Sequence, residues 1–186
     1  MLNMTEGIMK TKDNEPKIEM TSQDVVKLYS DFENMGIKIW VDGGWSVDAL
    51  LGRQIRHHND LDIAVQWKDI PRLKEYLDAN GYKELRVDSK CNFVVRDNGG
   101  REIDIHAFIY DDQGNIVDGV MYPATSLMGK GLIDGYSVRC LTPEYMVEAL
   151  AQYINKHPHK YLQAVYELCK KFNIDLPEEY LNCKDK

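Results

Sequence analysis

The stretch from residue 40 to residue 65 constrains this chain more than any other. Residues 37–41 are mostly apolar and β-branched, which predicts a buried strand. Gly43 and Gly44 follow, and glycine lets the backbone turn sharply and come close to a ligand. Residues 45–51 then place apolar side chains at helical spacing before a terminating glycine. The expected order is therefore strand, glycine turn and short helix.

A second strand is predicted to begin at Asp60-Leu61-Asp62. Residues two apart on a strand point to the same face, so Asp60 and Asp62 should project together. Two adjacent carboxylates repel each other, and the arrangement is costly unless a cation lies between them. Mg²⁺ is suited to this place because it takes carboxylate oxygens and substrate phosphates. The glycine turn adds N–H groups at a helix N-terminus, which suit a phosphate. Together the two features predict a site for a metal and a nucleoside triphosphate.

A third carboxylate lies on a later alternating segment, residues 101–108. Glu102, Asp104 and His106 share one face of this segment. If this strand neighbours the earlier one, Asp104 joins the first carboxylate pair. Three carboxylates on adjacent strands are what nucleotidyl transfer with two Mg²⁺ ions requires. Asp104 is then a ligand of the second ion, the general base for the incoming hydroxyl, or both in turn.

Other polar side chains near these carboxylates are interpreted as supporting residues. His58 is expected to orient the loop in which it lies rather than to bind metal, and His106 is expected to have a similar supporting role. Asp48, on the short helix, is expected to pair with Arg53 or Arg56 and to be structural.

Composition limits the class of protein. The chain has 186 residues, of which 44% are apolar, enough for a real core. Its formal net charge of −7 argues against a nucleic-acid-binding surface. The four cysteines have no CxxC spacing and are expected to be reduced thiols in a cytoplasmic protein. No apolar run is long enough to span a membrane, and the N-terminus lacks the apolar core of a signal peptide.

Three regions are expected along the chain. We expect residues 1–20 to form a flexible leader and residues 21–141 to form a catalytic domain. Residues 142–186 are expected to form a C-terminal region of two helices and a tail, with the first helix ending near Asn155. The predicted fold class is α+β, with a small mixed, mostly antiparallel sheet and helices on one face. Residues 116–135, rich in glycine, are expected to be irregular and to form a wall of the substrate cleft.

The same residues resemble a known family. The motif reads Trp40-x-Asp42-Gly43-Gly44-Trp45-x-Val47-Asp48, then Arg56-x-His58-x-Asp60-x-Asp62, then Asp104-Ile105-His106. This pattern resembles the nucleotidyltransferase superfamily and, within it, the small antibiotic nucleotidyltransferases, most of all those that modify lincosamides. The aminoglycoside nucleotidyltransferases share the Gly-Gly-Trp, the Arg-x-His-x-Asp-x-Asp run and the later aspartate. The resemblance covers residues 23–108 well, weakens beyond them, and implies the nucleotidyltransferase fold.

The resemblance implies an activity. Such enzymes transfer a nucleoside monophosphate, usually AMP from ATP, to a hydroxyl of a small antibiotic, and this inactivates the drug. Mg²⁺ is required and pyrophosphate leaves. By resemblance, Asp60 and Asp62 bind the metal, and Asp104 is a metal ligand or the base. The implied partners are an antibiotic acceptor and a nucleotide, with no nucleic acid and no membrane.

The resemblance also implies how the triphosphate is held. The glycine turn contacts the β- and γ-phosphates, and Arg56 and a lysine of the C-terminal helices meet the triphosphate. Lys160 is the first choice for that lysine and Lys156 the second. Residues 157–160 read His-Pro-His-Lys and depart from the acidic-residue-plus-lysine pattern of the family.

Several alternatives stay open at the level of sequence. An aminoglycoside is the first alternative acceptor, since the acidic balance suits a cationic drug and lincosamides are amines as well. A protein-modifying nucleotidyltransferase of a toxin–antitoxin pair is the second, and a non-enzymatic binding module that kept the fold is the third. The modified hydroxyl, the base of the nucleotide and a homodimer with a shared site are also left open.

Overall fold

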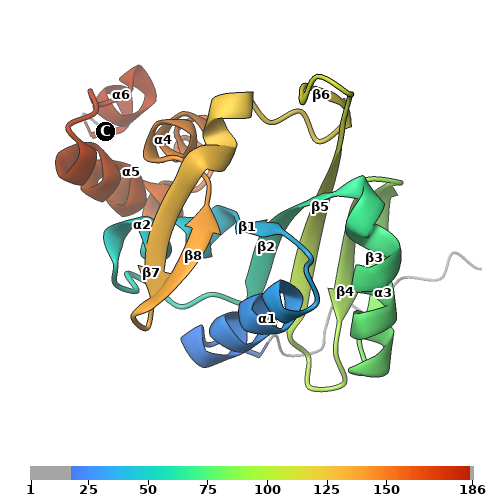
Figure 1. Ribbon diagram of the computed structural model, residues 1–186. Coiled ribbons are helices and arrows are strands. Elements are labelled where there is room, and N and C mark those ends of the chain that lie inside the picture. Colours follow the sequence, from blue (N-terminus) through green and yellow to red (C-terminus); the bar gives the residue numbers. More distant parts are fainter. Residues whose placement is uncertain (1–17, 185–186) are drawn as a thin grey trace, which may run out of the picture.

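A mixed eight-stranded sheet organises the molecule (Figure 1). The structure is a computed structural model that describes residues 18–184, and most of the predicted leader, residues 1–17, lies outside them. The strands are β1 (Ile39–Val41), β2 (Asp60–Gln66), β3 (Lys83–Ser89), β4 (Asn92–Arg96), β5 (Glu102–Tyr110), β6 (Ile116–Gly119), β7 (Gly129–Ile133) and β8 (Tyr136–Cys140). Their order is β3-β4-β5-β2-β1-β8-β7, and β6 pairs with β5. Two pairs, β2–β5 and β1–β8, are parallel and the others are antiparallel, which confirms the predicted fold class.

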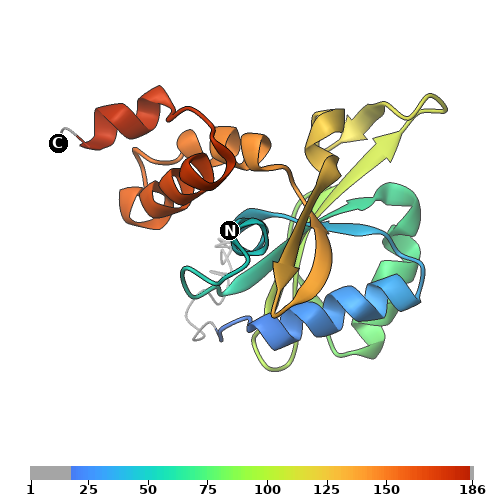
Figure 2. The ribbon, with the colours of Figure 1, turned by 60° about the vertical axis from the view of Figure 1, so that its left-hand side comes forward.

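The helices fall into two groups. They are α1 (Ser22–Asn34), α2 (Gly43–Leu51), α3 (Ile70–Ala79), α4 (Pro143–Ala151), α5 (Pro158–Phe172) and α6 (Glu178–Lys184), with 3-10 turns η1 (Trp67–Asp69) and η2 (Ala124–Met128). Helices α1 and α3 lie on one face of the sheet (Figure 1). The C-terminal helices gather to one side, as Figure 2 shows, and α2 packs against both α4 and α5. Helix α2 therefore connects the sheet to the C-terminal helices.

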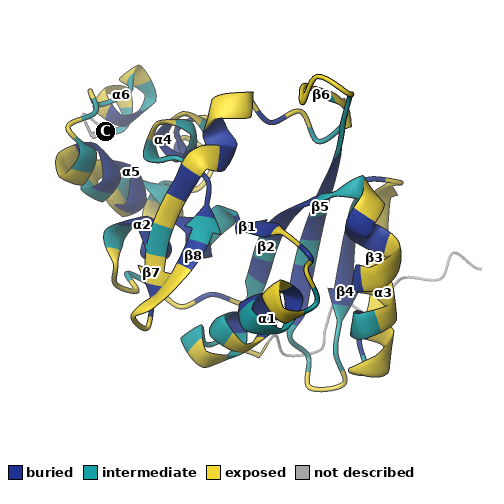
Figure 3. Ribbon diagram, in the orientation of Figure 1, coloured by how far each residue is buried: buried dark blue, intermediate teal, exposed yellow. Residues whose placement is uncertain are grey.

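The core lies under the central strands. One face of β2 and β5 is fully buried and apolar, as the two-residue period of a strand predicts. Its residues are Leu61, Ile63, Ile103 and Ile105. Figure 3 shows the buried residues concentrated on these strands, whereas every residue of the edge strand β3 is exposed. The opposite face of β2 and β5 is thereby left for polar side chains.

The segment 116–135 is more regular than expected. It holds β6, η2 and β7, where the glycine-rich composition indicated irregular chain. Glycine weakens a strand signal but lets another backbone approach closely. A Cβ at Gly131 would collide with Ala49 of α2, so the glycine is what allows α2 to pack directly on β7. The expectation of irregular chain was therefore wrong, whereas the expectation that this segment forms a wall of the substrate cleft stays a prediction.

The C-terminal helices also differ from expectation in their bounds. Helix α4 ends at Ala151, before the predicted end near Asn155, and α5 begins at Pro158. The expected tail contains α6, whose first turn carries Glu178 and Glu179, acidic residues that favour a helix N-terminus. In the part of the chain that the structure describes, no helix combines the length and apolar character needed to cross a membrane.

Candidate functional site

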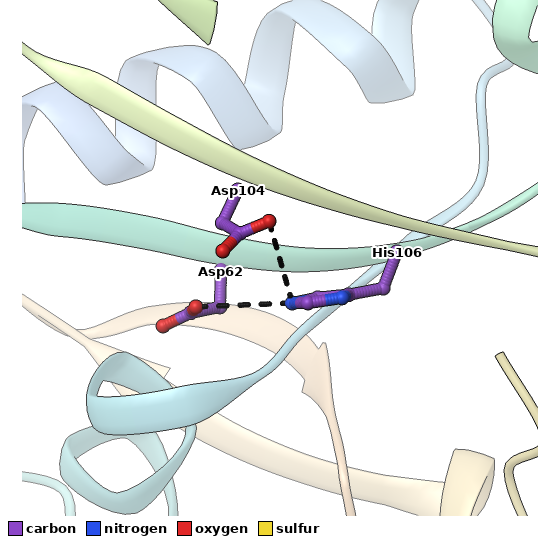
Figure 4. Close-up of side chains that lie close together, drawn as sticks. All are labelled: Asp62, Asp104 and His106. Atoms are coloured by element: carbon purple, nitrogen blue, oxygen red, sulfur yellow. Dashed lines mark ion pairs between the residues drawn. The ribbon is translucent and has the colours of Figure 1, made fainter. Parts of the chain in front are cut away.

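The structure brings Asp104 next to Asp62. Strands β2 and β5 run parallel in a register that pairs Asp62 with Asp104 and Asp60 with Glu102. Asp62, Asp104 and His106 each offer a ligand atom, and these atoms all lie within 4.8 Å of one another. Figure 4 shows the two carboxylates on neighbouring strands with the imidazole of His106 beside both.

One carboxylate oxygen of this group lacks a hydrogen bond. Asp104 Oδ1 is buried and finds no hydrogen-bond partner among the described residues. Burial raises the pKa of the Asp104 carboxyl, and the negative charges of Asp62 and Asp60 raise this pKa further, against the opposing effect of His106. Buried carboxylates that repel each other are stabilised by a cation between them. The oxygen-rich donor set therefore fits a divalent metal ion such as Mg²⁺.

His106 was expected only to support its neighbours, but its imidazole lies beside both carboxylates. Its Nε2 is 3.8 Å from Asp104 Oδ1 and 3.9 Å from Asp62 Oδ1. Burial lowers the pKa of His106, but the carboxylates of Asp62, Asp104 and Asp42 outweigh it, so that the pKa is raised overall. The sequence contained a signal for this closeness, because His106 follows Asp104 by two residues and therefore lies on the same face of β5.

Asp60 lies at the start of β2, outside the group whose ligand atoms come within 4.8 Å of one another. Its charge still reaches Asp104, since it contributes to the raised pKa of that carboxyl.

Two arginines that the sequence analysis did not single out lie near the acidic residues of β5. Arg86 Nη2 on β3 is 3.7 Å from Asp104 Oδ2. Glu102 forms an ion pair with Arg96.

The diglycine turn, Gly43-Gly44, forms the first two residues of α2 instead of preceding a helix at residue 45 as predicted, and it is fastened beside the carboxylates. Gly43 has φ +56°, and a Cβ at this position would collide with the carboxylate of Asp62. Asp42 N–H donates to the carbonyl of Asp62 at 2.9 Å. The Asp42 side chain accepts from Gly43 N–H at 2.6 Å and from the hydroxyl of Tyr122 at 2.8 Å. Tyr122, 80 residues away in the chain, is a site residue that local sequence patterns could not reveal.

Gly44, Arg56 and Lys160 meet at one small pocket between α2, the loop that follows it, and α5. A Cβ at Gly44 would collide with the guanidinium of Arg56 and the ring of His58. Lys156, the second choice for the cationic residue of the C-terminal helices, is not among the described residues that line this pocket. Apolar and aromatic side chains complete its wall, among them Val47, Ile55, Leu150 and Tyr161. Two cations and an apolar wall suit a ligand with a polyanionic part.

Asp48 has a different partner from the one expected. His58 Nε2 donates to Asp48 Oδ2 at 2.6 Å, and both side chains are almost fully buried. Arg53 forms its ion pair with Glu167 at 2.9 Å instead. The pairing of Asp48 with Arg53 or Arg56 was therefore wrong. The buried face of α2 explains this, because a guanidinium could reach Asp48 only by leaving solvent.

Sequence comparisons find similarity to proteins named for antibiotic resistance or antibiotic nucleotidyl transfer. The family model described as aminoglycoside-2''-adenylyltransferase matches residues 24–176. A lincosamide resistance protein of Staphylococcus haemolyticus is 32% identical over 99 residues, which cover 52% of this chain and 60% of that protein. A 2''-aminoglycoside nucleotidyltransferase of Escherichia coli is 23% identical over 133 residues, 71% of this chain and 73% of the relative. The chain thus spans less than two thirds of the first relative's length.

Solved structures share the fold. The lincomycin-bound crystal structure of the lincosamide antibiotic adenylyltransferase LnuA has a TM-score of 0.71 and 21% identity, covering 85% of this chain and all of that one (100%). ANT(2'')-Ia in complex with adenylyl-2''-tobramycin has a TM-score of 0.68 and 21% identity, covering 81% of this chain and 88% of that one. The predicted nucleotidyltransferase fold is confirmed.

Proposed function

This chain belongs to the aminoglycoside-2''-adenylyltransferase family, a family of nucleotidyltransferases, and we propose that it transfers AMP from ATP to a hydroxyl of a small antibiotic. The main support is the pair Asp62 and Asp104, which lie next to each other across β2 and β5 beside the diglycine turn, with a buried Asp104 oxygen that accepts no hydrogen bond from the described residues. A solvated surface pair would need neither the burial nor the glycine at position 43.

A lincosamide is the proposed acceptor. The resistance protein from Staphylococcus haemolyticus, at 32% identity, supports this choice over the more distant 2''-aminoglycoside enzyme at 23%. An aminoglycoside is the second candidate, because the family model that matches residues 24–176 is described by that activity. Both acceptors present hydroxyl groups and amines, so the same site chemistry serves either one.

Asp62 and Asp104 would hold Mg²⁺, with Asp60 completing the acidic set. Bound there, Mg²⁺ would neutralise phosphate charge and stabilise the oxygens that attack and leave. Two ions are the number proposed. Asp104 is also proposed to accept the proton of the acceptor hydroxyl, which is supported by its burial because burial raises the carboxyl pKa.

The chain's own residues then perform an in-line displacement. The acceptor oxygen forms a bond to the α-phosphorus, and the bond from that phosphorus to the bridging oxygen of the β-phosphate breaks. The hydroxyl proton passes to Asp104, and pyrophosphate leaves. Backbone N–H groups of Gly43 and Gly44 are proposed to meet the β- and γ-phosphates, with Arg56 and Lys160 as cations. Most of the rate would come from positioning and charge neutralisation.

The direct test uses purified protein, ATP and Mg²⁺ with a panel of lincosamides and aminoglycosides. Mass spectrometry should find a nucleotide adduct on a lincosamide, formed only with Mg²⁺ present. An adduct confined to aminoglycosides would establish the second candidate. No adduct on any member of the panel would refute antibiotic transfer.

A further inference from the structure

A buried acid–histidine pair lies behind the diglycine turn. Asp48 on α2 is 2% exposed, and His58, in the loop from α2 to β2, is 1% exposed. His58 Nε2 donates to Asp48 Oδ2 at 2.6 Å, and the N–H of Ile55 donates to Asp48 Oδ1 at 3.1 Å. One carboxylate therefore fastens this loop to α2 at two points, on either side of Arg56.

The fastened segment ends at the proposed triphosphate site. The His58 ring and the Arg56 guanidinium both lie where a Cβ of Gly44 would be. The ring of Trp45 supports the imidazole from α2, with ring centroids 4.7 Å apart. The Arg56 Nη1 also donates to the carbonyl of His57 at 2.9 Å, within the same fastened segment. The guanidinium therefore belongs to a segment that the two contacts of Asp48 tie to α2, while the N–H of Met20 donates to the carbonyl of His58 at 2.8 Å from the other side of the loop.

Stability alone does not explain this pair. Taking a carboxylate and an imidazole out of water carries a desolvation cost, and well-packed apolar residues of similar size often serve a core as well. A buried polar pair does, however, select one arrangement of the loop, because its hydrogen bonds are satisfied in that arrangement only. Here that arrangement places Arg56 at Gly44.

We propose that Asp48 and His58 are positioning residues, which hold the loop so that the Arg56 guanidinium stands at Gly44 to receive the triphosphate. The inference rests on the proposed nucleotidyl transfer. Neither side chain touches the reacting atoms. When the tie is broken, Arg56 becomes free to move away from Gly44, so nucleotide binding weakens while acceptor binding is unchanged.

Substitutions at His58 separate positioning from packing. His58→Phe keeps a ring against Trp45 and removes the donor to Asp48, and we expect about a tenfold rise in KM for ATP from the misplaced cation. The KM for the antibiotic should stay constant. His58→Gln supplies an amide donor near the position of Nε2 and should restore most of the loss. A His58→Phe variant with unchanged KM for ATP and only a lower Tm would overturn the proposal.

Coupling to Arg56 gives the sharper test. If His58 acts through Arg56, the double variant Arg56→Ala/His58→Phe should have the same KM for ATP as Arg56→Ala alone. Multiplication of the two single effects would contradict the mechanism. Asp24→Asn is the control, because it weakens a partly exposed ion pair with Arg101 in another part of the fold and should lower Tm without changing the KM for ATP.

Measurements on the wild-type protein distinguish a failure of the proposed AMP transfer from a failure of the positioning role. Wild-type protein that neither binds ATP nor transfers AMP refutes the proposed function itself. Active wild-type protein whose His58→Phe variant behaves like Asp24→Asn refutes only the positioning role.

Discussion

At the scale of single residues, Asp104 is the residue to which the proposed mechanism gives most of the chemistry. Its carboxylate is partly buried, lies across from Asp62, feels the charge of Asp60, and has one oxygen with no hydrogen-bond partner among the described residues. Such a group is unfavourable for the isolated protein and favourable once a cation is bound. The functional cost of changing Asp104 should therefore be large, and its structural cost small.

We expect Asp104→Asn to lower the rate of AMP transfer by at least about 10²-fold, the range typical for loss of a general base. Its Tm in EDTA should equal or exceed that of the wild type, because a repelling charge is gone. Single-turnover transfer and thermal unfolding measure both quantities. Activity within a factor of two or so of the wild type would remove Asp104 from the mechanism.

Gly43 is expected to be irreplaceable for two reasons that can be separated. Gly43→Ala meets a left-handed backbone at φ +56° and a collision with Asp62. Gly36→Ala meets a similar φ of +68° but open space, so it should cost only the conformational penalty of about 1–2 kcal/mol. Urea unfolding and KM for ATP should show that both variants lose stability and that only Gly43→Ala loses nucleotide binding. Equal behaviour of the two variants would argue against a close approach to the turn.

Local patterns predicted the residues that lie near one another in sequence or alternate along one strand. The face shared by Asp60 and Asp62, and that of Asp104, follow from the two-residue period of a strand. The contact of Tyr122 with Asp42 joins residues 80 apart, and no local period encodes it. The choice of His58 over an arginine as the partner of Asp48 likewise depended on burial, which appears only once α2 is packed.

At the scale of elements, α2 and α5 together line the pocket that is proposed to receive the nucleotide. Lys160 on α5 lines the pocket with Arg56 and Gly44. Helix α2 can pack directly against β7 because β7 has no side chain at Gly131. Gly129 and Gly131 also explain why the sequence did not predict β7. Glycine lowers strand propensity, although here it permits the helix to approach.

The two lysines before and within α5 provide a matched pair for testing this arrangement. Lys160→Met should raise KM for ATP about tenfold, as expected for loss of one hydrogen bond to a charged group. Lys156→Met, which removes the same charge from an exposed position outside the pocket, should leave KM unchanged. Steady-state kinetics over a range of ATP concentrations decides between them. The reverse ranking would transfer the role to Lys156.

At the scale of the whole molecule, binding at the site should stabilise the fold. A ligand that binds only the folded chain, present at a hundred times its Kd, adds about 2.7 kcal/mol to the free energy of unfolding. For a chain of this size, that corresponds to a rise in Tm of roughly 5–10 °C. Thermal unfolding with Mg²⁺ and ATP should show this rise in the wild type and little of it in Asp62→Asn. An equal rise in both would place the ligand elsewhere.

The overall architecture was predictable because each local signal agreed with the same sheet, and because the motif over residues 40–104 matched a known family. The arrangement of α4, α5 and α6 beside the sheet was less predictable, since it depends on packing between distant segments.

Electron paramagnetic resonance of Mn²⁺, with a non-hydrolysable ATP analogue present, tests the central claim most directly. The wild type and Gly36→Ala should bind Mn²⁺ saturably at the carboxylate group, whereas Asp62→Asn and Asp104→Asn should lose that binding while remaining folded. Undiminished Mn²⁺ binding by both aspartate variants would show that these carboxylates do not form the metal site.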